Sequence, residues 1–419
     1  MTSPEPAEQQ GTFASLRLRN YRLFFLGMLV SNTGLWVSRT ATDWLVLVIL
    51  TNGSATALGV AIALSFLPIP LLAPWGGALA DRWDKRRLLV FTQVASAAVA
   101  SVLAVLVLGG AAQLWQVYLL TLLQGVLNAL DNPTRQAFVS ELVPGTHLAN
   151  AVGLNSASFH AARLIGPAAG GLLIAAVGVG PAFVVNAVSF LAVLVALLLM
   201  RGAELLPVPH GRGRGGVREG LAYVRTRPDI LLILFCVFML GTFGMNFAIT
   251  NALMATAVFG VGPEGYGLLG SMMAIGSLSG ALLAARRRQP RLRTLVLALA
   301  GFAAFAFAAA LSPSYWVFGA LLIPLGLCAI TAMTTANARV QLTTDPHMRG
   351  RVMALYMAVF MGGTPIGSPV IGWVGDALGP RWTLLAGALA IALSLVVVAV
   401  YAVRTGAWPP PSRGRTGVS

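Results

Sequence analysis

Residues 77–87 read Gly-Ala-Leu-Ala-Asp-Arg-Trp-Asp-Lys-Arg-Arg. This stretch ends one long apolar run, Ala55–Ala80, and leads into another, Leu88–Gly109. A helix needs about 20 apolar residues to cross the hydrocarbon core of a bilayer, and each run is long enough. A charged loop between two such runs predicts a membrane protein whose spans are joined by basic loops.

The composition of the whole chain indicates the same class of protein. Of its 419 residues, 57% are apolar and 10% are charged, whereas soluble domains average roughly 45–50% and roughly 25%. A soluble fold could not bury so much apolar surface. The composition also argues against a disordered chain, a disulfide-rich secreted scaffold and, despite a net charge of +15, a nucleic-acid-binding protein. Cys236 and Cys328 lie inside apolar runs, and we expect no disulfide.

Apolar runs bounded by charges or turn residues predict twelve spans, six on each side of a central break. The first six are Tyr21–Leu50, Ala55–Ala80, Leu88–Gly109, Leu114–Leu130, Asn150–Val179 and Ala182–Met200, and the second six are Ile230–Phe259, Gly265–Ala285, Thr294–Leu311, Tyr315–Ala338, Val352–Ala377 and Trp382–Val403. The predicted domains are a cytoplasmic tail at 1–19, a six-helix bundle at 20–200, a cytoplasmic linker at 201–228, a second bundle at 229–403 and a cytoplasmic tail at 404–419. In the linker, Val217, Leu221 and Val224 recur at helical spacing, which leaves open a short helix on the membrane surface or a solvated linker.

The basic residues predict the orientation of the spans, because Lys and Arg accumulate in cytoplasmic loops. With the N-terminus inside, 24 of the 28 basic residues fall in inner segments and only Arg381 falls in an outer one. All but one of the basic residues are Arg, which together with the richness in Ala, Gly and Pro is typical of a bacterium with a GC-rich genome. We therefore expect a multi-pass protein of the bacterial inner, or plasma, membrane with both termini in the cytoplasm.

The two halves of the chain repeat each other. Residues 77–79 and 280–282 both read Gly-Ala-Leu before a basic loop, 203 positions apart. Arg135 stands six residues before Glu141, and 204 positions later Arg339 stands six residues before Asp345. Nearly equal offsets indicate the internal duplication that many transporters carry.

These segments resemble the major facilitator superfamily. Residues 77–87 resemble its loop signature Gly-x-x-x-Asp-Arg-x-Gly-Arg-Arg, with Asp84 in place of the second Gly. Gly166-Pro167-Ala168-Ala169-Gly170-Gly171 resembles its antiporter signature, with Ala162 in place of the leading Gly, which favours export over uptake. Residues 131–139 and 349–353 are similar to the branch that contains macrolide-efflux and siderophore-export proteins. The resemblance covers about Arg19 to Val403 and implies an all-α membrane fold of twelve helices in two six-helix bundles.

The same resemblance implies a cytoplasmic gate. In the superfamily, the acid that matches Asp81 and the arginines that match Arg82 and Arg86 are thought to latch the two halves together. The Arg that the superfamily usually carries in the fourth span would fall at Thr121 and is missing, so a proton pathway through that Arg does not transfer. We expect the gate to comprise Gly77, Asp81, Arg82, Arg86 and the companion pairs Arg135 with Glu141 and Arg339 with Asp345. The alternative is that the basic residues of the loop only fix the orientation of the spans in the membrane.

Polar residues that recur at helical spacing in a span mark a face turned to protein or water rather than to lipid. In the first span, Asn32, Trp36, Arg39 and Asp43 form such a face. A charge at this depth costs about 2.5–3.5 kcal/mol, so Arg39 and Asp43 are a functional hypothesis. Burial and a neighbouring Arg act on the acid in opposite directions, which makes Asp43 a candidate for proton exchange near neutral pH. A permanent ion pair that fixes helix packing is the alternative.

The fifth span carries His160 and Arg163 on one face. His160 suits a proton relay, and a hydrogen-bonded packing residue is the alternative. With His160 neutral, two arginines face one acid, which favours an anionic or polar substrate group over a cationic drug. The C-terminal half has only Asn, hydroxyl and apolar side chains at mid-membrane depth, so we expect adaptable contacts there. The predicted proton and substrate site comprises Asn32, Arg39, Asp43, His160, Arg163, Asn246 and Asn251.

These features predict a secondary transporter that exports an amphipathic small molecule, such as a drug, a macrolide-like or a siderophore-like compound, by alternating access in exchange for protons. The single Lys, Lys85, lies outside any phosphate-binding Gly-x-x-x-x-Gly-Lys motif, so an ion or substrate gradient must supply the energy. The alternatives are an uncoupled or uptake facilitator of a small metabolite and a transport-dead membrane sensor or partner protein. We expect no enzymatic activity, cofactor, metal or nucleic acid, and a monomer whose partners are its substrate, protons and the lipid bilayer.

Overall fold

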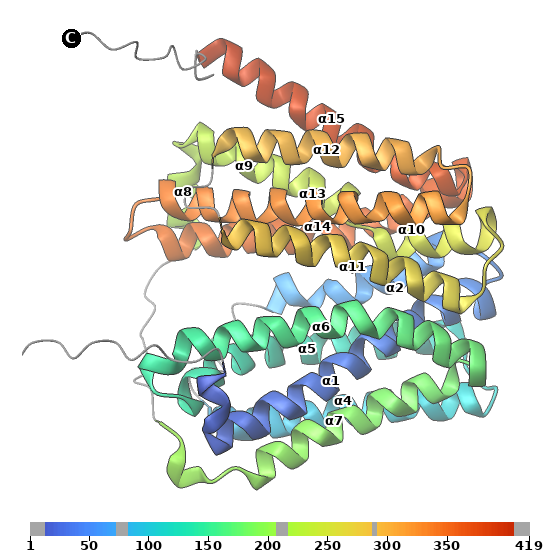
Figure 1. Cartoon of the computed structure of the whole chain (residues 1–419), viewed down its shortest axis with the longest axis vertical. Coiled ribbons are helices and arrows are strands. Elements are labelled where there is room, and N and C mark those ends of the chain that lie inside the picture. The colour runs from blue at the N-terminus through green and yellow to red at the C-terminus, as the bar shows by residue number, and fades with distance from the viewer. Residues whose placement is uncertain (1–12, 73–82, 207–216, 287–290, 406–419) are drawn as a thin grey trace, which may run out of the picture.

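The computed structural model describes residues 13–72, 83–206, 217–286 and 291–405 (Figure 1), and within these ranges all regular structure is helical. The first part of the chain forms η1 (Ala14–Arg17), α1 (Arg19–Trp44), η2 (Leu45–Leu50), α2 (Ala55–Phe66), α4 (Lys85–Leu108), α5 (Leu114–Leu142), α6 (Gly145–Val177) and α7 (Gly180–Leu199). The second part forms η3 (Gly202–Glu204), α8 (Val217–Arg225), α9 (Pro228–Met239), η4 (Leu240–Gly244), α10 (Phe247–Leu253), η5 (Met254–Val258), α11 (Pro263–Ala285), α12 (Leu292–Ala310), α13 (Tyr315–Thr343), α14 (Arg349–Leu378) and α15 (Pro380–Thr405). Of these, η2, η4 and η5 are short π-helical segments that continue a longer helix.

Helix covers almost all of the twelve predicted spans where the structure describes them, and the seventh span is broken at Met245 and Asn246, between η4 and α10. Ten of the helical runs are long and apolar enough to cross a membrane. The other two predicted spans are α1 and α5. They fall short because they carry the polar faces of the bundle, with Arg39 and Asp43 in α1 and Gln124 and Asn128 in α5. The helices that are least apolar are therefore those with the most polar side chains at depth.

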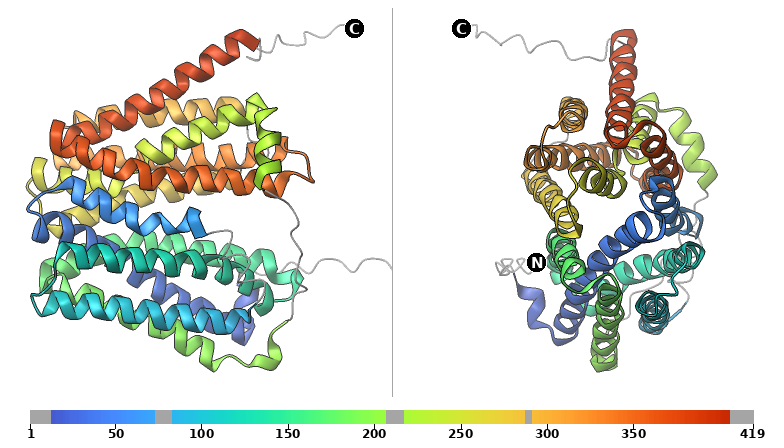
Figure 2. Two further views of the ribbon diagram at one scale, coloured as in Figure 1. Left: turned by 180° about the vertical axis from the view of Figure 1, so that it is seen from behind. Right: turned by 90° about the vertical axis from the view of Figure 1, so that its right-hand side faces the viewer.

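The helices form two groups, which Figure 1 shows as a lower and an upper layer and Figure 2 shows from two further sides. In the first group, here called the N-terminal half, α1 packs on α6 and α7, and α4 packs on α5 and α7. In the second, the C-terminal half, α13 packs on α11 and α12, and α15 packs on α12 and α14. Two helix pairs make most of the described contact between the halves, α6 with α11 and α2 with α14, and α10 adds smaller contacts with α1 and α2.

We call the end of the molecule that holds the turns at 51–54 and 259–262 the outer end, and the opposite end the inner end, after the predicted orientation. The start of α1 and the end of α15 lie at the same end (Figure 1). The linker contains the helix α8, which packs against α14 at the inner end, where Glu219 pairs with Arg351 at 2.7 Å. The position of the termini relative to the membrane stays a prediction.

Three predicted boundaries differ from the structure by five residues or more. The helix α6 begins at Gly145 rather than at Asn150. The helix α5 continues to Leu142 rather than ending near Leu130, and α13 continues to Thr343. The extension of α5 pairs its charges within the protein, Arg135 with Asp131 and Glu141 with Lys85, so the residues around Arg135 are helical rather than part of a loop. Asp84, which departs from the family signature, accepts a hydrogen bond from the Arg87 N–H at 2.8 Å and caps the start of α4.

Candidate substrate and proton site

A cavity of about 510 Å³ lies between the two halves, and both halves line it. The N-terminal half contributes residues of α1, α2, α4, α5, α6 and α7, and the C-terminal half contributes residues of α10, α11, α13 and α14. Most of the lining is apolar, aromatic or small. Its charged members are Arg39, Asp43 and Arg163, which gives a mainly apolar pocket with a few polar groups, the usual character of a small-molecule site.

Asp43 is held from the opposite half of the protein. The hydroxyl of Tyr266, at the start of α11, donates a hydrogen bond to Asp43 Oδ2 at 2.6 Å. The Tyr266 ring is buried and stacks on Trp44, with ring centroids 6.4 Å apart. Nothing in the sequence points to Tyr266, because a single Tyr near the end of an apolar span carries no signal of its own until its partner in the other half is known.

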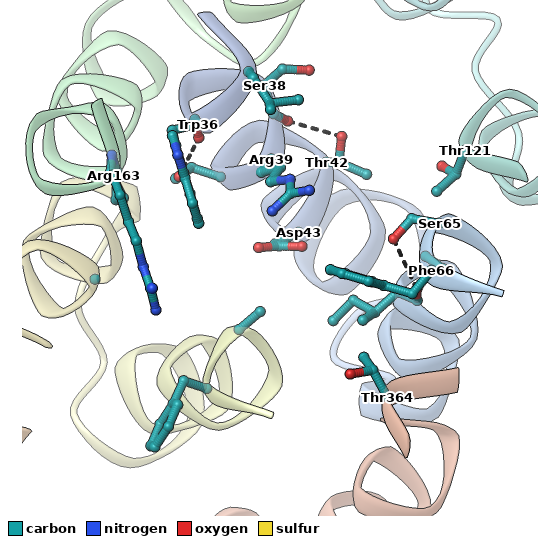
Figure 3. Close-up of a pocket in the computed structure, with 18 of the residues that line it drawn as sticks. Trp36, Ser38, Arg39, Thr42, Asp43, Ser65, Phe66, Thr121, Arg163 and Thr364 are labelled. Atoms are coloured by element: carbon teal, nitrogen blue, oxygen red, sulfur yellow. Dashed lines mark hydrogen bonds between the residues drawn. The ribbon is translucent and has the colours of Figure 1, made fainter. Parts of the chain in front are cut away.

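Arg39 and Asp43 lie near each other but do not form the direct ion pair that was the alternative to proton exchange. Within the described residues no salt bridge of 4.0 Å or less joins them. The Arg39 guanidinium lies over the rings of Trp36, at 5.0 Å from the centroid, and Phe66, at 5.6 Å. Figure 3 shows Arg39 and Asp43 directed into the same open space.

Arg163 enters the cavity from α6 and approaches the same indole. Its guanidinium lies 5.6 Å from the centroid of the Trp36 ring, and Figure 3 shows Trp36 between Arg163 and Arg39. Throughout the described residues, neither guanidinium makes a hydrogen bond or a salt bridge, and the buried Trp36 Nε1 also has no hydrogen-bond partner. Three groups that can donate hydrogen bonds therefore meet at the cavity without an acceptor.

The two predicted asparagines of the C-terminal half line the cavity. Asn246 donates through Nδ2 to the Thr242 carbonyl at 2.7 Å. The Oδ1 atoms of Asn246 and Asn251 are buried and have no hydrogen-bond partner among the described residues. Both amides can therefore accept hydrogen bonds from a bound molecule.

Asn32 and His160 lie outside the cavity lining. Asn32 is buried in α1, two helical turns from Arg39 toward the inner end. His160 is half-buried, and its ring contacts that of Phe159. Because they are three residues apart, His160 and Arg163 point in directions that differ by about 60° around the helix axis. This difference places His160 outside the cavity while Arg163 lines it.

The antiporter-like stretch forms a close joint between three helices. A Cβ on Gly166 would meet the Trp36 side chain, and one on Gly170 would meet Val37 and Thr40, both of α1. Toward the other half, Pro167 packs on Gly267 and Gly270 of α11, and a Cβ on Gly171 would meet the backbone at Pro263. The residues Gly166, Pro167, Gly170 and Gly171 thus let α6 approach α1 and α11 at the same level.

The predicted cytoplasmic gate is described in part. Gly77, Asp81 and Arg82 lie outside the described residues. Arg86 differs from the expectation of a latch between halves, because its guanidinium donates to the carbonyls of Leu197, Leu198 and Met200 at 2.9–3.3 Å and caps α7 within the N-terminal half.

The companion pair Arg135 with Glu141 is not formed. Arg135 Nη2 pairs with Asp131 Oδ2 at 2.5 Å, one turn earlier on α5, and Glu141 pairs with Lys85 at 2.6 Å. Asp131 is 5% exposed, and its Oδ1 also accepts hydrogen bonds from Thr92 and Gln93 of α4, each at 2.8 Å. Spacing of four residues on one helix could have predicted this pair.

The second companion pair lies at the inner end of α13. Arg339 is half-buried within that helix, and Asp345 is exposed just beyond it. The Asp345 N–H donates to the hydroxyl of Tyr223 in α8 at 3.3 Å. Gate opening by this pair stays a prediction. No cluster of three His, Cys, Asp or Glu side chains suited to a metal is found in the described part of the chain.

Comparison with known families now places the chain. A family described as "Transmembrane secretion effector" matches residues 10–408. The chain belongs to this family of major facilitator transporters. It is a multi-pass membrane protein of a transporter family, as the loop and antiporter signatures indicated.

Individual relatives are distant in sequence and match over most of their length. The staphyloferrin A transporter of Staphylococcus aureus is 26% identical over 85% of this chain and 90% of its own. The macrolide efflux protein A of Streptococcus pyogenes is 24% identical over 84% and 89%. The multidrug efflux pump Tap of Mycolicibacterium fortuitum is 28% identical over 90% and 94%.

Solved structures support the fold. A bacterial homologue of the human lysosomal transporter Spinster superposes with a TM-score of 0.72 over 94% of this chain and 99% of its own, at 15% sequence identity. This likeness confirms the major facilitator fold that the sequence predicted.

Proposed function

We propose that the protein exports an amphipathic small molecule by alternating access in exchange for protons. The observation that carries the proposal is the cavity between the two halves, in which the single acid of the lining, Asp43, bonds to Tyr266 of the opposite half. A carboxylate placed at the joint between two rocking halves can link its own protonation to their movement.

We infer that the structure represents a state closed at the outer end. The hydrogen bonds and the tightest packing described between the halves lie from mid-membrane to that end. Ser271 Oγ donates to the Leu164 carbonyl at 2.5 Å, a Cβ on Gly59 would meet the backbone at Ser368, and Asp376 of α14 bonds to the start of α2. Of the ion pairs described near the inner end, Lys85 with Glu141 and Arg135 with Asp131 stay within the N-terminal half, and Glu219 with Arg351 joins the linker helix α8 to the C-terminal half. None of them joins the two halves. The cavity would therefore be reached from the cytoplasm.

The hydrogen bond between Asp43 and Tyr266 can couple movement of the two halves to the binding of a proton or a substrate. A hydroxyl donor holds an ionised carboxylate more strongly than a protonated one, so an empty carrier with ionised Asp43 is held closed at the outer end. A proton on Asp43 weakens that bond, and a hydrogen-bond donor of the substrate can replace Tyr266. Movement then requires either a proton or a substrate, which is the condition that an antiporter must meet.

The relatives support export as the direction and amphipathic compounds as the cargo. Two are named for efflux of macrolides or of several drugs, and a third is named as a transporter of staphyloferrin A. The joint around Pro167 and Gly171, which resembles the antiporter signature, packs the two halves together at the level of the cavity. Cargo identity is left to experiment.

A growth panel with and without the protein tests export. Cells that lack their own major pumps would express the wild type, Asp43→Asn, or the surface control Glu204→Gln, and growth would be measured across antibiotics, dyes and organic acids. We expect the wild type and Glu204→Gln to protect equally, because Glu204 is exposed and pairs only with Arg201 in the described residues. We expect Asp43→Asn to lose protection at equal protein level.

Proteoliposomes with an imposed pH gradient test coupling for any compound found in this way. The wild type should move protons only when that compound is present, and Asp43→Asn should move none. Full protection by Asp43→Asn, or uphill export without proton movement, would contradict proton exchange and favour the uncoupled facilitator.

A further inference from the structure

The charges of the cavity do not balance. Among the described residues, Arg39 and Arg163 line it with one acid, Asp43, and the acid already accepts a hydrogen bond from Tyr266. The remaining polar lining consists of neutral side chains such as Asn246 and Asn251. The lining therefore carries a net positive charge when Asp43 is ionised, and a larger one when it is protonated.

Both arginines also lack acceptors. Across the described residues, neither guanidinium has a hydrogen bond or a salt bridge, and each rests on the ring of Trp36. Other described arginines do have acceptors, for example Arg86 on three carbonyls and Arg381 on two. A guanidinium has five hydrogen-bond donors, and burying these donors without acceptors is unfavourable. Two buried guanidinium groups that lack acceptors therefore suit a ligand that provides acceptor atoms.

We propose that the substrate is an amphipathic acid whose anionic group binds between Arg39 and Arg163 at Trp36. The planar guanidinium fork matches a carboxylate, sulfonate or phosphate, and the unpartnered Trp36 Nε1 adds a neutral donor. The apolar body of the molecule lies against Phe66, Met333 and Phe360. This assignment of a substrate class rests on the proposed export function and concerns the same cavity.

The geometry separates this class from cationic compounds. A cationic group would meet two like charges with one satisfied acid between them, and like charges brought together at a site with little water are strongly disfavoured. A neutral amphipathic molecule would fill the apolar part of the cavity and leave both guanidinium groups without acceptors. An anion avoids the charge repulsion and also provides acceptors for both guanidinium groups.

Two matched dyes test the proposal by equilibrium binding. 8-Anilinonaphthalene-1-sulfonate and N-phenyl-1-naphthylamine share one aromatic skeleton, and only the first carries an anionic group. Both would be titrated by fluorescence into the full chain in phosphatidylcholine nanodiscs, with empty nanodiscs subtracted. We expect the sulfonate to bind the wild type about ten-fold more tightly than the neutral dye, the effect of one charge-assisted hydrogen bond.

Variants locate the anion. Arg39→Gln and Arg163→Gln should each weaken binding of the sulfonate about ten-fold and change that of the neutral dye less than about two-fold. Arg163→Lys keeps the charge but not the planar fork, and should restore only part of the affinity. Arg201→Gln removes the same charge from the surface, where the Arg201 side chain is 66% exposed, and should change neither dye.

Equal binding of the two dyes to the wild type would overturn the proposal without any variant. Unchanged binding of the sulfonate in both Gln variants would overturn it as well, because the anion would then bind elsewhere. The binding assay does not depend on transport. If the wild type binds the sulfonate more tightly but does not protect cells, the proposed export function is wrong and the acid-binding site stands. If the protein protects cells but binds both dyes equally, the acid-binding site is wrong and the export function stands.

Discussion

At the outer end, Asp376 caps a helix of the other half. Its carboxylate, near the end of α14, accepts hydrogen bonds from the N–H groups of Ala55 at 2.7 Å and Thr56 at 2.9 Å, and from the Ser54 hydroxyl at 3.3 Å. These donors form the first turn of α2, where the helix dipole also favours a negative charge. Opening the outer end would leave the N–H groups and the carboxylate to water.

Asp376→Asn keeps the size of the side chain and removes its charge and one acceptor atom. Loss of a cap costs about 0.5–2 kcal/mol, and loss of the charge near a helix start costs about 0.3–1 kcal/mol. A combined loss of about 1.4 kcal/mol would raise the population open at the outer end about ten-fold. The effect should be confined to this equilibrium, because Asp376 makes its described cross-half contacts only at the closed outer end.

Thiol labelling measures the open population. Cys236 and Cys328 are free and buried, and both would be replaced so that a single cysteine, Ala61→Cys in the cavity lining, reports access. A membrane-impermeant maleimide would be applied to right-side-out and to inside-out vesicles separately. Labelling from the outer side should be about ten-fold faster in Asp376→Asn, since it proceeds through the minor open state.

The control for this experiment is an acid at the same end. Glu264 is exposed at the start of α11, and its carboxylate lies beside Gly262 of its own turn. Glu264→Gln should leave labelling unchanged. Equal outer-side labelling in Asp376→Asn and its parent, or the same rise in Glu264→Gln, would refute the assignment of Asp376 as the closing contact.

Two further predictions concern packing and buried charge. Gly267→Ala places a Cβ against the Pro167 backbone, which cannot rotate away, so it should lower the unfolding free energy by about 1–3 kcal/mol. The control is Gly153→Ala on α6, whose Cβ would meet nothing within 4 Å. This control should not destabilise the protein in the same detergent melt. Asp131→Asn leaves Arg135 without its buried partner and should cost about 3 kcal/mol in denaturant unfolding. Adding Arg135→Gln should recover part of this loss, and no recovery would mean that the pair is not the cause.

The sequence was sufficient to predict the helical spans and the part of the site that the N-terminal half contributes through Arg39 and Asp43. Apolar length predicts the spans because lipid requires every backbone group to bond within its own helix. Spacing on α1 also predicted that Arg39 and Asp43 share a face, and both line the cavity. The partner of Asp43 could not be predicted, because Tyr266 is 223 residues away and meets it only through packing of the two halves. His160 shows the limit of periodicity, since one face of a helix is wider than one pocket.

The two carboxylates that join the halves differ in what can change them. Asp43 of the N-terminal half bonds to a side chain of the C-terminal half inside the cavity, where a proton or a substrate can reach it. Asp376 of the C-terminal half bonds to backbone N–H groups of the N-terminal half and lies outside the cavity lining. One rocking movement must break both contacts, and a ligand in the cavity can weaken only the first.

This difference separates two roles that a single transport assay would confuse. On the proposed mechanism, Asp376 sets the resting balance between the closed and open outer end, and Asp43 makes that balance depend on protons. Asp376→Asn should therefore raise outer-side labelling at every pH while each exported molecule still exchanges for the same number of protons. Asp43→Asn should remove the pH dependence of labelling and the exchange together. If Asp376→Asn also abolished the pH dependence, the two carboxylates would act as one switch, and the division of roles would be wrong.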